Sequence, residues 1–258
     1  MILCSSCHGG CCRRYPVDLT GFDIVNIVRN MMLNVSVFID LIPVPIKDRE
    51  ELEEKLKSYA VFKFKGSDKY FRLCLKRIES PLMPKTYKCV FLQEWPSEGS
   101  TNNIAGRCGI YNFRPHICEA FPMSFDKKGL FAYIYDPALK DKDYPSDNPA
   151  YQICPETLTM ENFGKYVSDY KRNQTLAIYK FEKDFFREIA TQWNNQKEPG
   201  TFEEFLLRLQ KIYDNRIQGP INQDNIKPSK DMVKNPGAVK HAGAKTVKKD
   251  IDSQDSAK

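Results

Sequence analysis

Four cysteines near the start of the chain have the residue type and spacing of a metal site. They form the pattern C-x2-C-x3-C-C and are Cys4, Cys7, Cys11 and Cys12. Two cysteines separated by two residues can turn both sulfurs toward one metal ion, at about 2.3 Å for zinc. Gly9 and Gly10 lie inside the pattern, where glycine lets the backbone adopt turns that other residues avoid. Clustered cysteines in a chain without secretory features bind metal more often than they form disulfides, so we expect a thiolate-bound metal.

The adjacency of Cys11 and Cys12 bears on the kind of centre. Side chains of neighbouring residues point in different directions. The two sulfurs therefore reach one metal only through a sharp turn, or each serves a different metal atom. This slightly favours a centre with several metal atoms over a single zinc ion.

A second group of cysteines extends the candidate ligand set. Its members are Cys89, Cys108, Cys118 and Cys154. Together the two groups supply eight thiolates, enough for two four-sulfur sites or for one cluster and a redox pair. Cys74 differs, because it stands between two leucines in a strand pattern with no second cysteine nearby. We expect Cys74 to be a core residue, as free cysteines often are.

Several cationic side chains stand close to the cysteines in sequence. Four thiolates around a divalent metal carry about two negative charges, which a guanidinium can offset. We expect Arg114 to lie beside the centre and to help bind the cofactor, whereas Arg13 and Arg14 fit solvent-exposed positions at least as well. His8 and His116 flank cysteines and imidazole binds zinc and iron well, but the thiolates already suffice.

The overall composition argues against several other classes of protein. The net charge of +6 over 258 residues is too small for a dedicated nucleic-acid binder, and residues 222–258 carry half of it. There is no run of about 18 apolar residues that would span a bilayer, and no secretory signal before Cys4. We expect a cytoplasmic protein without a nucleic-acid or membrane partner.

The first half of the chain reads as short helices and strands. Thr20 and Asp23 have the spacing of a capping box and predict a helix to about Asn34. A charged helix is expected over 49–59. Aromatic and β-branched runs predict strands, and a polar run predicts a loop. The expected strands cover 61–64, 69–78, 86–92 and 129–136, and the expected loop covers 94–107.

The second half reads as two long helices. Thr159 is expected to cap the first, and its apolar positions form one predicted buried stripe. That stripe comprises Phe163, Val167, Tyr170, Ile178, Phe181, Phe185, Ile189 and Trp193. Pro199 and Gly200 should end this helix, and Thr201 with Glu204 should cap the second.

These elements predict an α+β fold in three parts. A small, irregular, cysteine-rich metal-binding domain with a few short strands is expected over 1–155. A long C-terminal helical hairpin over 156–218 should pack on it. Residues 219–258 are poor in apolar side chains and are expected to be a disordered tail.

The order of the motifs resembles the YkgJ-type cysteine-cluster family, which is described as zinc- or iron-chelating. The matching segments are C-S-S-C-H-G-G-C-C-R from Cys4, V-D-L-T from Val17, C-V-F-L from Cys89 and G-R-C-G-I-Y-N-F-R-P-H-I-C-E-A-F-P from Gly106. The resemblance covers roughly residues 1–155. It implies metal ligands at Cys4, Cys7, Cys11, Cys12, Cys89, Cys108 and Cys118. Cys154 matches a late Cys-Pro of the family, although Glu156 stands where the family often carries glycine.

Three functions follow from these patterns. The preferred one is an iron–sulfur cluster with a redox or electron-transfer role, which allows for a protein redox partner. The alternatives are a structural zinc module without catalysis, and a protein-modifying enzyme similar to the flagellin lysine N-methylases, which carry a related cysteine motif. No catalytic residue can be assigned from the sequence, because no phosphate-binding loop or nucleophile elbow is present.

Overall fold

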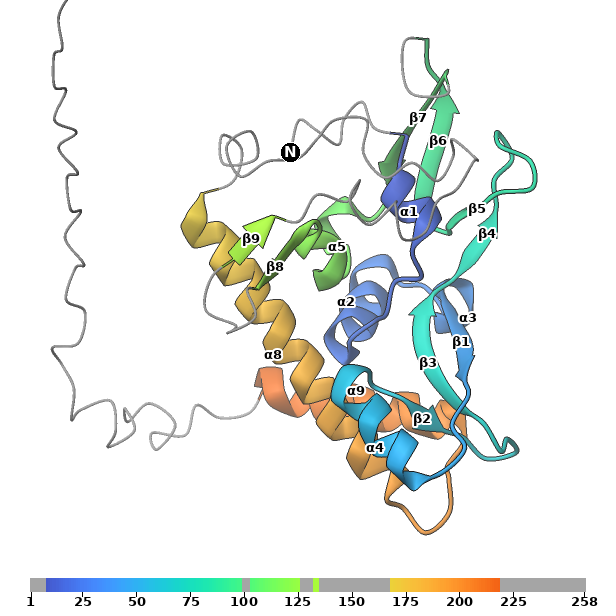
Figure 1. The fold of residues 1–258 in the computed structure, drawn as a ribbon, viewed down its shortest axis with the longest axis vertical. Coiled ribbons are helices and arrows are strands. Elements are labelled where there is room, and N and C mark those ends of the chain that lie inside the picture. Colours follow the sequence, from blue (N-terminus) through green and yellow to red (C-terminus); the bar gives the residue numbers. More distant parts are fainter. Residues whose placement is uncertain (1–7, 99–102, 126–131, 135–167, 219–258) are drawn as a thin grey trace, which may run out of the picture. The chain divides into compact units, whose positions relative to one another are not determined.

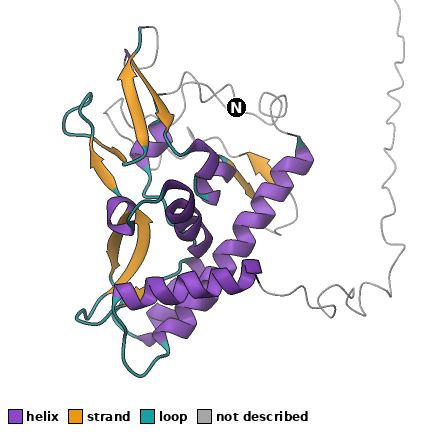
Figure 2. Ribbon diagram, turned by 180° about the vertical axis from the view of Figure 1, so that it is seen from behind, coloured by secondary structure: helices purple, strands orange, loops and turns teal. Residues whose placement is uncertain are grey.

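The computed structural model describes residues 8–98, 103–125, 132–134 and 168–218. The fold is α+β, as predicted. With the exception of Gln218, these residues belong to one compact unit that ends at Ile217. Most strands lie on one side of this unit and the long helix α8 (Asp169–Asn194) on the other, with α2 (Gly21–Met31) between them (Figures 1 and 2). The last two strands, over 123–125 and 132–134, lie beside α8 instead. The predicted disordered tail lies outside the described residues.

Helix α2 begins where the capping box predicts. The Thr20 amide donates to Asp23 Oδ2 at 2.9 Å, and the Asp23 amide donates to Thr20 Oγ1 at 3.2 Å. The helix ends at Met31 rather than near Asn34, because Met32 takes the left-handed conformation with φ 50°. Asn34 is instead the N-cap of the short helix α3 (Val35–Phe38), and its Oδ1 accepts a hydrogen bond from the Ser36 amide.

The central sheet has three antiparallel strands in the order β1-β3-β2. They are β1 (Ile39–Val44), β2 (Phe62–Lys63) and β3 (Tyr70–Leu75). Strand β1 lies in residues that the sequence left unassigned, whereas β2 and β3 lie inside predicted strands. The charged helix α4 (Arg49–Ser58) is confirmed, with Asp48 as its N-cap.

Three two-stranded hairpins complete the β-structure. They pair β4 (Arg77–Glu79) with β5 (Tyr87–Cys89), β6 (Leu92–Pro96) with β7 (Ile104–Cys108), and β8 (Met123–Phe125) with β9 (Ala132–Ile134). The polar loop predicted over 94–107 is therefore wrong at both ends. The prediction treated the polar side chains of this segment as a sign of an exposed loop. In β6, however, the side chain of Glu94 lies opposite Gly106 and is buried because it pairs with Arg13 and Lys88.

Two helices form the predicted C-terminal hairpin. Helix α8 begins at Asp169 with Ser168 as its N-cap, and not at Thr159, which lies outside the described residues. Helix α9 (Phe202–Gln218) begins with the predicted capping box, in which the Thr201 amide donates to Glu204 Oε2 at 2.7 Å. No helix among the described residues is long and apolar enough to cross a membrane.

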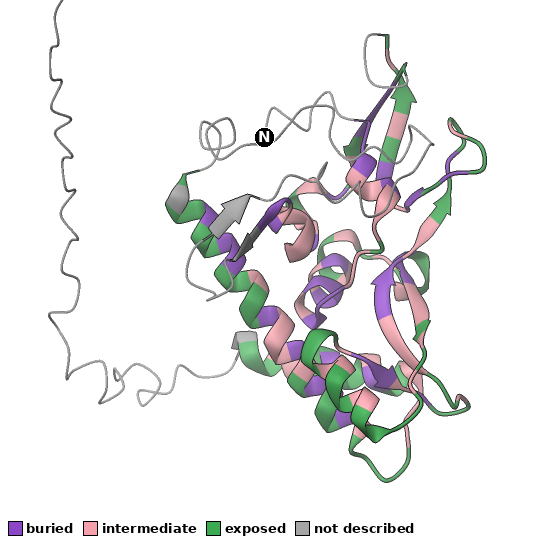
Figure 3. Cartoon of the chain, in the orientation of Figure 1, coloured by how far each residue is buried: buried purple, intermediate pink, exposed green. Residues whose placement is uncertain are grey.

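The predicted buried stripe is wrong in the first part that the structure describes, and its members Phe163 and Val167 lie outside the described residues. Tyr170, Ile178 and Phe181 are exposed, whereas Ile189 and Trp193 are buried as expected. Figure 3 shows buried, intermediate and exposed residues alternating along this helix. The buried face between Arg172 and Glu182 is largely polar and also includes Thr175. A hydrophobicity pattern cannot detect such a face, since its side chains are polar; Glu182, for example, accepts from Tyr213 Oη and from Arg216.

Aromatic side chains join the hairpin to the sheet. The Phe205 ring lies 4.6 Å from that of Phe62 and 5.2 Å from that of Trp193. Trp193 Nε1 donates to the Lys63 carbonyl at 2.8 Å. Such clusters combine a large buried area with favourable ring geometry, so α8 and α9 are held firmly on β2.

The close approach of α2 to the hairpin depends on Gly21. A Cβ atom at this position would lie 2.7 Å from Tyr213 Cε2 and 2.9 Å from Leu209 Cδ1. We expect Gly21→Ala to lower the free energy of unfolding by about 1–3 kcal/mol, because overpacking forces neighbouring elements apart. Asn30→Ala, on the exposed side of the same helix, should change it by less than about 0.5 kcal/mol. Urea denaturation measures both, and equal midpoints would contradict this packing.

Candidate metal centre

Helix α1 (Gly10–Arg14) carries the first two described cysteines of the candidate centre. Gly9 precedes it with φ 77°, and its carbonyl accepts from the Cys12 amide at 2.9 Å. A Cβ atom on Gly9 would lie 2.7 Å from Leu92 Cδ1, so a side chain is disfavoured by both conformation and space. Cys4 and Cys7 lie outside the described residues.

The β-hairpins place two further cysteines near α1. Helix α1 packs on β5, which ends at Cys89. After two intervening residues the chain enters β6, whose Leu92 pairs with Cys108 of β7. Gly106 lies against the loop before α1, since a Cβ atom there would be 3.1 Å from the His8 carbonyl oxygen.

Cys118 comes from the short helix α5 (His116–Ala120), which is fixed to the start of α2. Asp23 Oδ1 accepts from the His116 amide at 3.0 Å and lies 3.0 Å from His116 Nδ1, an ion pair when the imidazole is protonated. The capping-box partner Asp23 of α2 therefore also positions α5. Burial acts to lower the pKa of His116, but the hydrogen bond and charge of Asp23 outweigh it and raise that pKa.

Five predicted ligands come close enough to influence one another's ionisation: Cys11, Cys12, Cys89, Cys108 and Cys118. Burial raises the pKa of Cys89 to about 11, and raises the pKa of Cys118 well above its usual value. Charge on Cys89, Cys11 and Cys108 adds to the shift at Cys118. The Cys11–Cys12 hydrogen bond lowers the pKa of Cys11 and raises that of Cys12. Burial raises the pKa of Cys108.

Arg114 lies beside these thiols. Its charge acts to lower the pKa of Cys11 and of Cys108, and its guanidinium stacks on the Tyr111 ring at 4.3 Å from the centroid. A cation at this position would also stabilise a negatively charged thiolate–metal centre. Whether Arg114 contacts a bound cofactor stays a prediction.

The donor set fits a soft or borderline metal. Thiolates suit zinc and iron–sulfur centres, and a metal that binds buried cysteines displaces their protons. Within the described ranges, no three His, Cys, Asp or Glu side chains already stand in a metal-binding arrangement. The assignment of Cys4, Cys7 and Cys154 as ligands falls outside those ranges and stays a prediction, as does any ligand role of His8 or His116.

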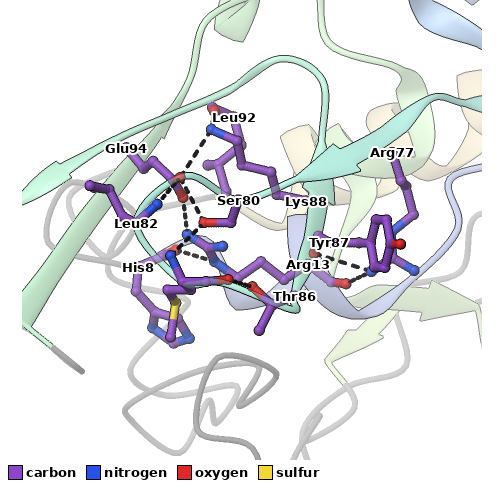
Figure 4. A network of polar contacts seen from close by, with 11 residues as sticks. His8, Arg13, Arg77, Ser80, Leu82, Thr86, Tyr87, Lys88, Leu92 and Glu94 are labelled. Atoms are coloured by element: carbon purple, nitrogen blue, oxygen red, sulfur yellow. Dashed lines mark hydrogen bonds and ion pairs between the residues drawn. The ribbon is translucent and has the colours of Figure 1, made fainter.

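A buried polar network lies next to α1 and is drawn in Figure 4. Arg13 forms an ion pair with Glu94, and its Nε donates to the His8 carbonyl at 3.2 Å. Lys88 Nζ lies 3.3 Å from Glu94 Oε1, and Ser80 Oγ donates to that oxygen at 2.7 Å. Burial acts to raise the pKa of Glu94, but Ser80 and the two cations outweigh it and lower that pKa.

This network corrects one prediction and adds residues that the sequence analysis missed. A solvent-exposed position for Arg13 is wrong, since its side chain is fully buried. Arg14 is partly exposed. Nothing in the sequence singled out Lys88 or Glu94, because no sequence pattern marks a lone lysine or glutamate in a short strand as buried.

Cys74 is a core residue, as predicted. It lies in β3, is fully buried, and its thiol donates to Asp18 Oδ1 at 3.3 Å. Burial raises its pKa far above the usual value. No described candidate ligand appears among its electrostatic partners, which include Asp18, Arg72 and Asp40.

Serine substitutions should separate the two kinds of cysteine. We expect Cys11→Ser and Cys118→Ser each to lower bound metal and melting temperature together, because serine replaces a thiolate with a poor ligand for these metals. Cys74→Ser should keep its metal, since serine can donate to Asp18 as the thiol does. Elemental analysis and thermal unfolding measure both properties. Full metal retention in both site variants would contradict a shared centre.

The comparisons with known proteins agree with the predicted family. The model of a cysteine-cluster family, CxxCxxCC, described as "Putative zinc- or iron-chelating domain", matches residues 3–144. No curated protein and no solved structure matches the chain significantly. The match spans more than half of the chain and includes α1, both cysteine-bearing hairpins and α5. The chain therefore belongs to the CxxCxxCC family of zinc- or iron-chelating domains.

Proposed function

We propose that the protein holds an iron–sulfur cluster through its clustered cysteines and uses it in a redox or electron-transfer role. The convergence of five thiols from four segments carries this proposal. A structural zinc ion takes four ligands, so five thiols, with Cys4 and Cys7 a few positions earlier in sequence, exceed what one zinc needs. The adjacent Cys11 and Cys12 also suit a centre with several metal atoms.

The surroundings of the thiols support a redox centre. A bound cluster would supply one-electron chemistry, at a potential that depends on its hydrogen bonds, its charge and its exposure to water. Arg114 brings a positive charge to Cys11 and Cys108. Cys89 is buried and the other four sites are half-buried, so the protein withdraws the sulfurs from water. A cytoplasmic location and a protein electron partner belong to this proposal.

A structural zinc module is the alternative, and one observation favours it. The segments that carry the cysteines are a five-residue α1, a five-residue α5 and two-stranded hairpins. Isolated elements of this size are marginally stable, so a metal that joins them would contribute directly to folding.

The lysine methylase alternative has less support. Two hollows occur on the described surface, one of about 470 Å³ between α2 and α9 and one of about 610 Å³ against α4 and α8. Neither is lined by a candidate cysteine. Neither hollow therefore provides a substrate site next to the candidate metal centre.

The metal content of protein purified without oxygen distinguishes the first two functions. We expect iron together with acid-labile sulfide, and a broad absorption band near about 400 nm, which is typical of thiolate-bound clusters. Reduction with dithionite should bleach this band, and air should restore it if the cluster is redox-active. Stoichiometric zinc in a colourless protein would contradict the iron–sulfur proposal and favour the structural module.

A further inference from the structure

Two buried cations lie directly next to candidate ligands in sequence. Arg13 follows Cys12, and Lys88 precedes Cys89. Both cations bind the same carboxylate, that of Glu94. The exposed fractions of these side chains are 0% for Arg13, 8% for Lys88 and 2% for Glu94. We call these three residues the charge triad.

The charge triad connects two segments that carry cysteines with the partner strand of a third. Arg13 belongs to α1, Lys88 to β5, and Glu94 to β6, whose partner strand β7 ends at Cys108. The ion pair between Arg13 and Glu94 links residues that lie 81 positions apart in sequence. Apart from the covalent chain, these side chains provide a direct polar link between α1 and both hairpins.

Backbone groups on both sides of Cys11 and Cys12 are held by the same network. Arg13 Nε donates to the His8 carbonyl ahead of the two cysteines. Arg77 Nη2 donates to the Arg13 carbonyl behind them, and Arg77 stands opposite Cys89 in the β4–β5 register. Lys88 Nζ also donates to the Leu92 carbonyl at 2.8 Å, which ties β5 to the start of β6 (Figure 4).

We infer that the charge triad is a positioning device that holds α1, β5 and the β6–β7 hairpin in the one arrangement in which their cysteines can share a metal centre. This inference depends on the proposed function in one respect, namely that the chain binds a metal. Apolar contacts tolerate small sliding movements, whereas a forked guanidinium between a carboxylate and a carbonyl has a narrow geometry. The triad also leaves one buried positive charge in excess, which a negatively charged thiolate–metal centre would offset.

A matched pair of variants tests the inference in the full chain. Glu94→Gln removes the carboxylate charge from the triad with little change in shape. Glu182→Gln is the control, because Glu182 is similarly buried, with 5% of its side chain exposed, and also pairs with an arginine, Arg216. Glu182 lies on α8, which carries no candidate ligand among the described residues.

The readout is the rate at which excess EDTA removes the metal, zinc or iron, that the purified chain holds. Each protein is measured at the same interval below its own melting temperature. We expect Glu94→Gln to release metal about tenfold faster or more, since loss of partners around a metal site typically weakens binding by 10–100-fold. Glu182→Gln should release it at nearly the wild-type rate. Equal rates for the two variants would overturn the inference.

A second variant keeps the test decisive if Glu94→Gln does not fold. Lys88→Met removes one cation and leaves the Arg13–Glu94 pair balanced, so the fold should tolerate it better. We expect faster metal release than in the wild type, since β5 loses its link to β6. A wild-type rate in Lys88→Met would contradict the role of Lys88. A wild-type chain that holds no metal at all would instead contradict the proposed function.

Discussion

Five thiols drawn together and largely withdrawn from water set the main constraint on this structure. Burial and the mutual repulsion of charge raise the pKa of Cys118 well above its usual value, and burial raises that of Cys89 to about 11. Without a metal, burial and the charge that these thiols place on one another disfavour thiolates at Cys89, Cys108 and Cys118. A divalent cation reverses this balance, because it replaces the protons and binds the thiolates together. The burial of five neighbouring thiols is therefore more favourable in the metal-bound chain than in the metal-free chain.

Separate devices bring each cysteine-bearing segment to this place. Glycine at position 9 allows the turn into α1 and the close approach of Leu92. Asp23 caps α2 and at the same time holds the first residue of α5, two positions before Cys118. The pair formed by Arg13 and Glu94 joins α1 to the β6–β7 hairpin. Local capping, steric fit and buried charge thus act on the same small region, while the aromatic cluster of β2, α8 and α9 stabilises the far side of the unit.

The predictable parts of this structure are those encoded by residues close in sequence. The capping boxes at Thr20 and Thr201 depend on residues three positions apart, so both helix starts could be predicted. The core position of Cys74 follows from its apolar neighbours. The pairing of Arg13 with Glu94 could not be predicted, because it joins residues 81 positions apart and depends on where the hairpin folds. The burial of the polar face of α8 around Glu182 could not be predicted for a related reason, because it depends on partners in α9.

X-ray absorption at the edge of the bound metal tests most directly whether these cysteines hold it. The full chain is measured as purified without oxygen. The account predicts a first shell of sulfur at about 2.3 Å for either zinc or iron, with an additional shell of metal neighbours if a cluster is present. A first shell dominated by nitrogen or oxygen at about 2.0–2.1 Å would contradict it.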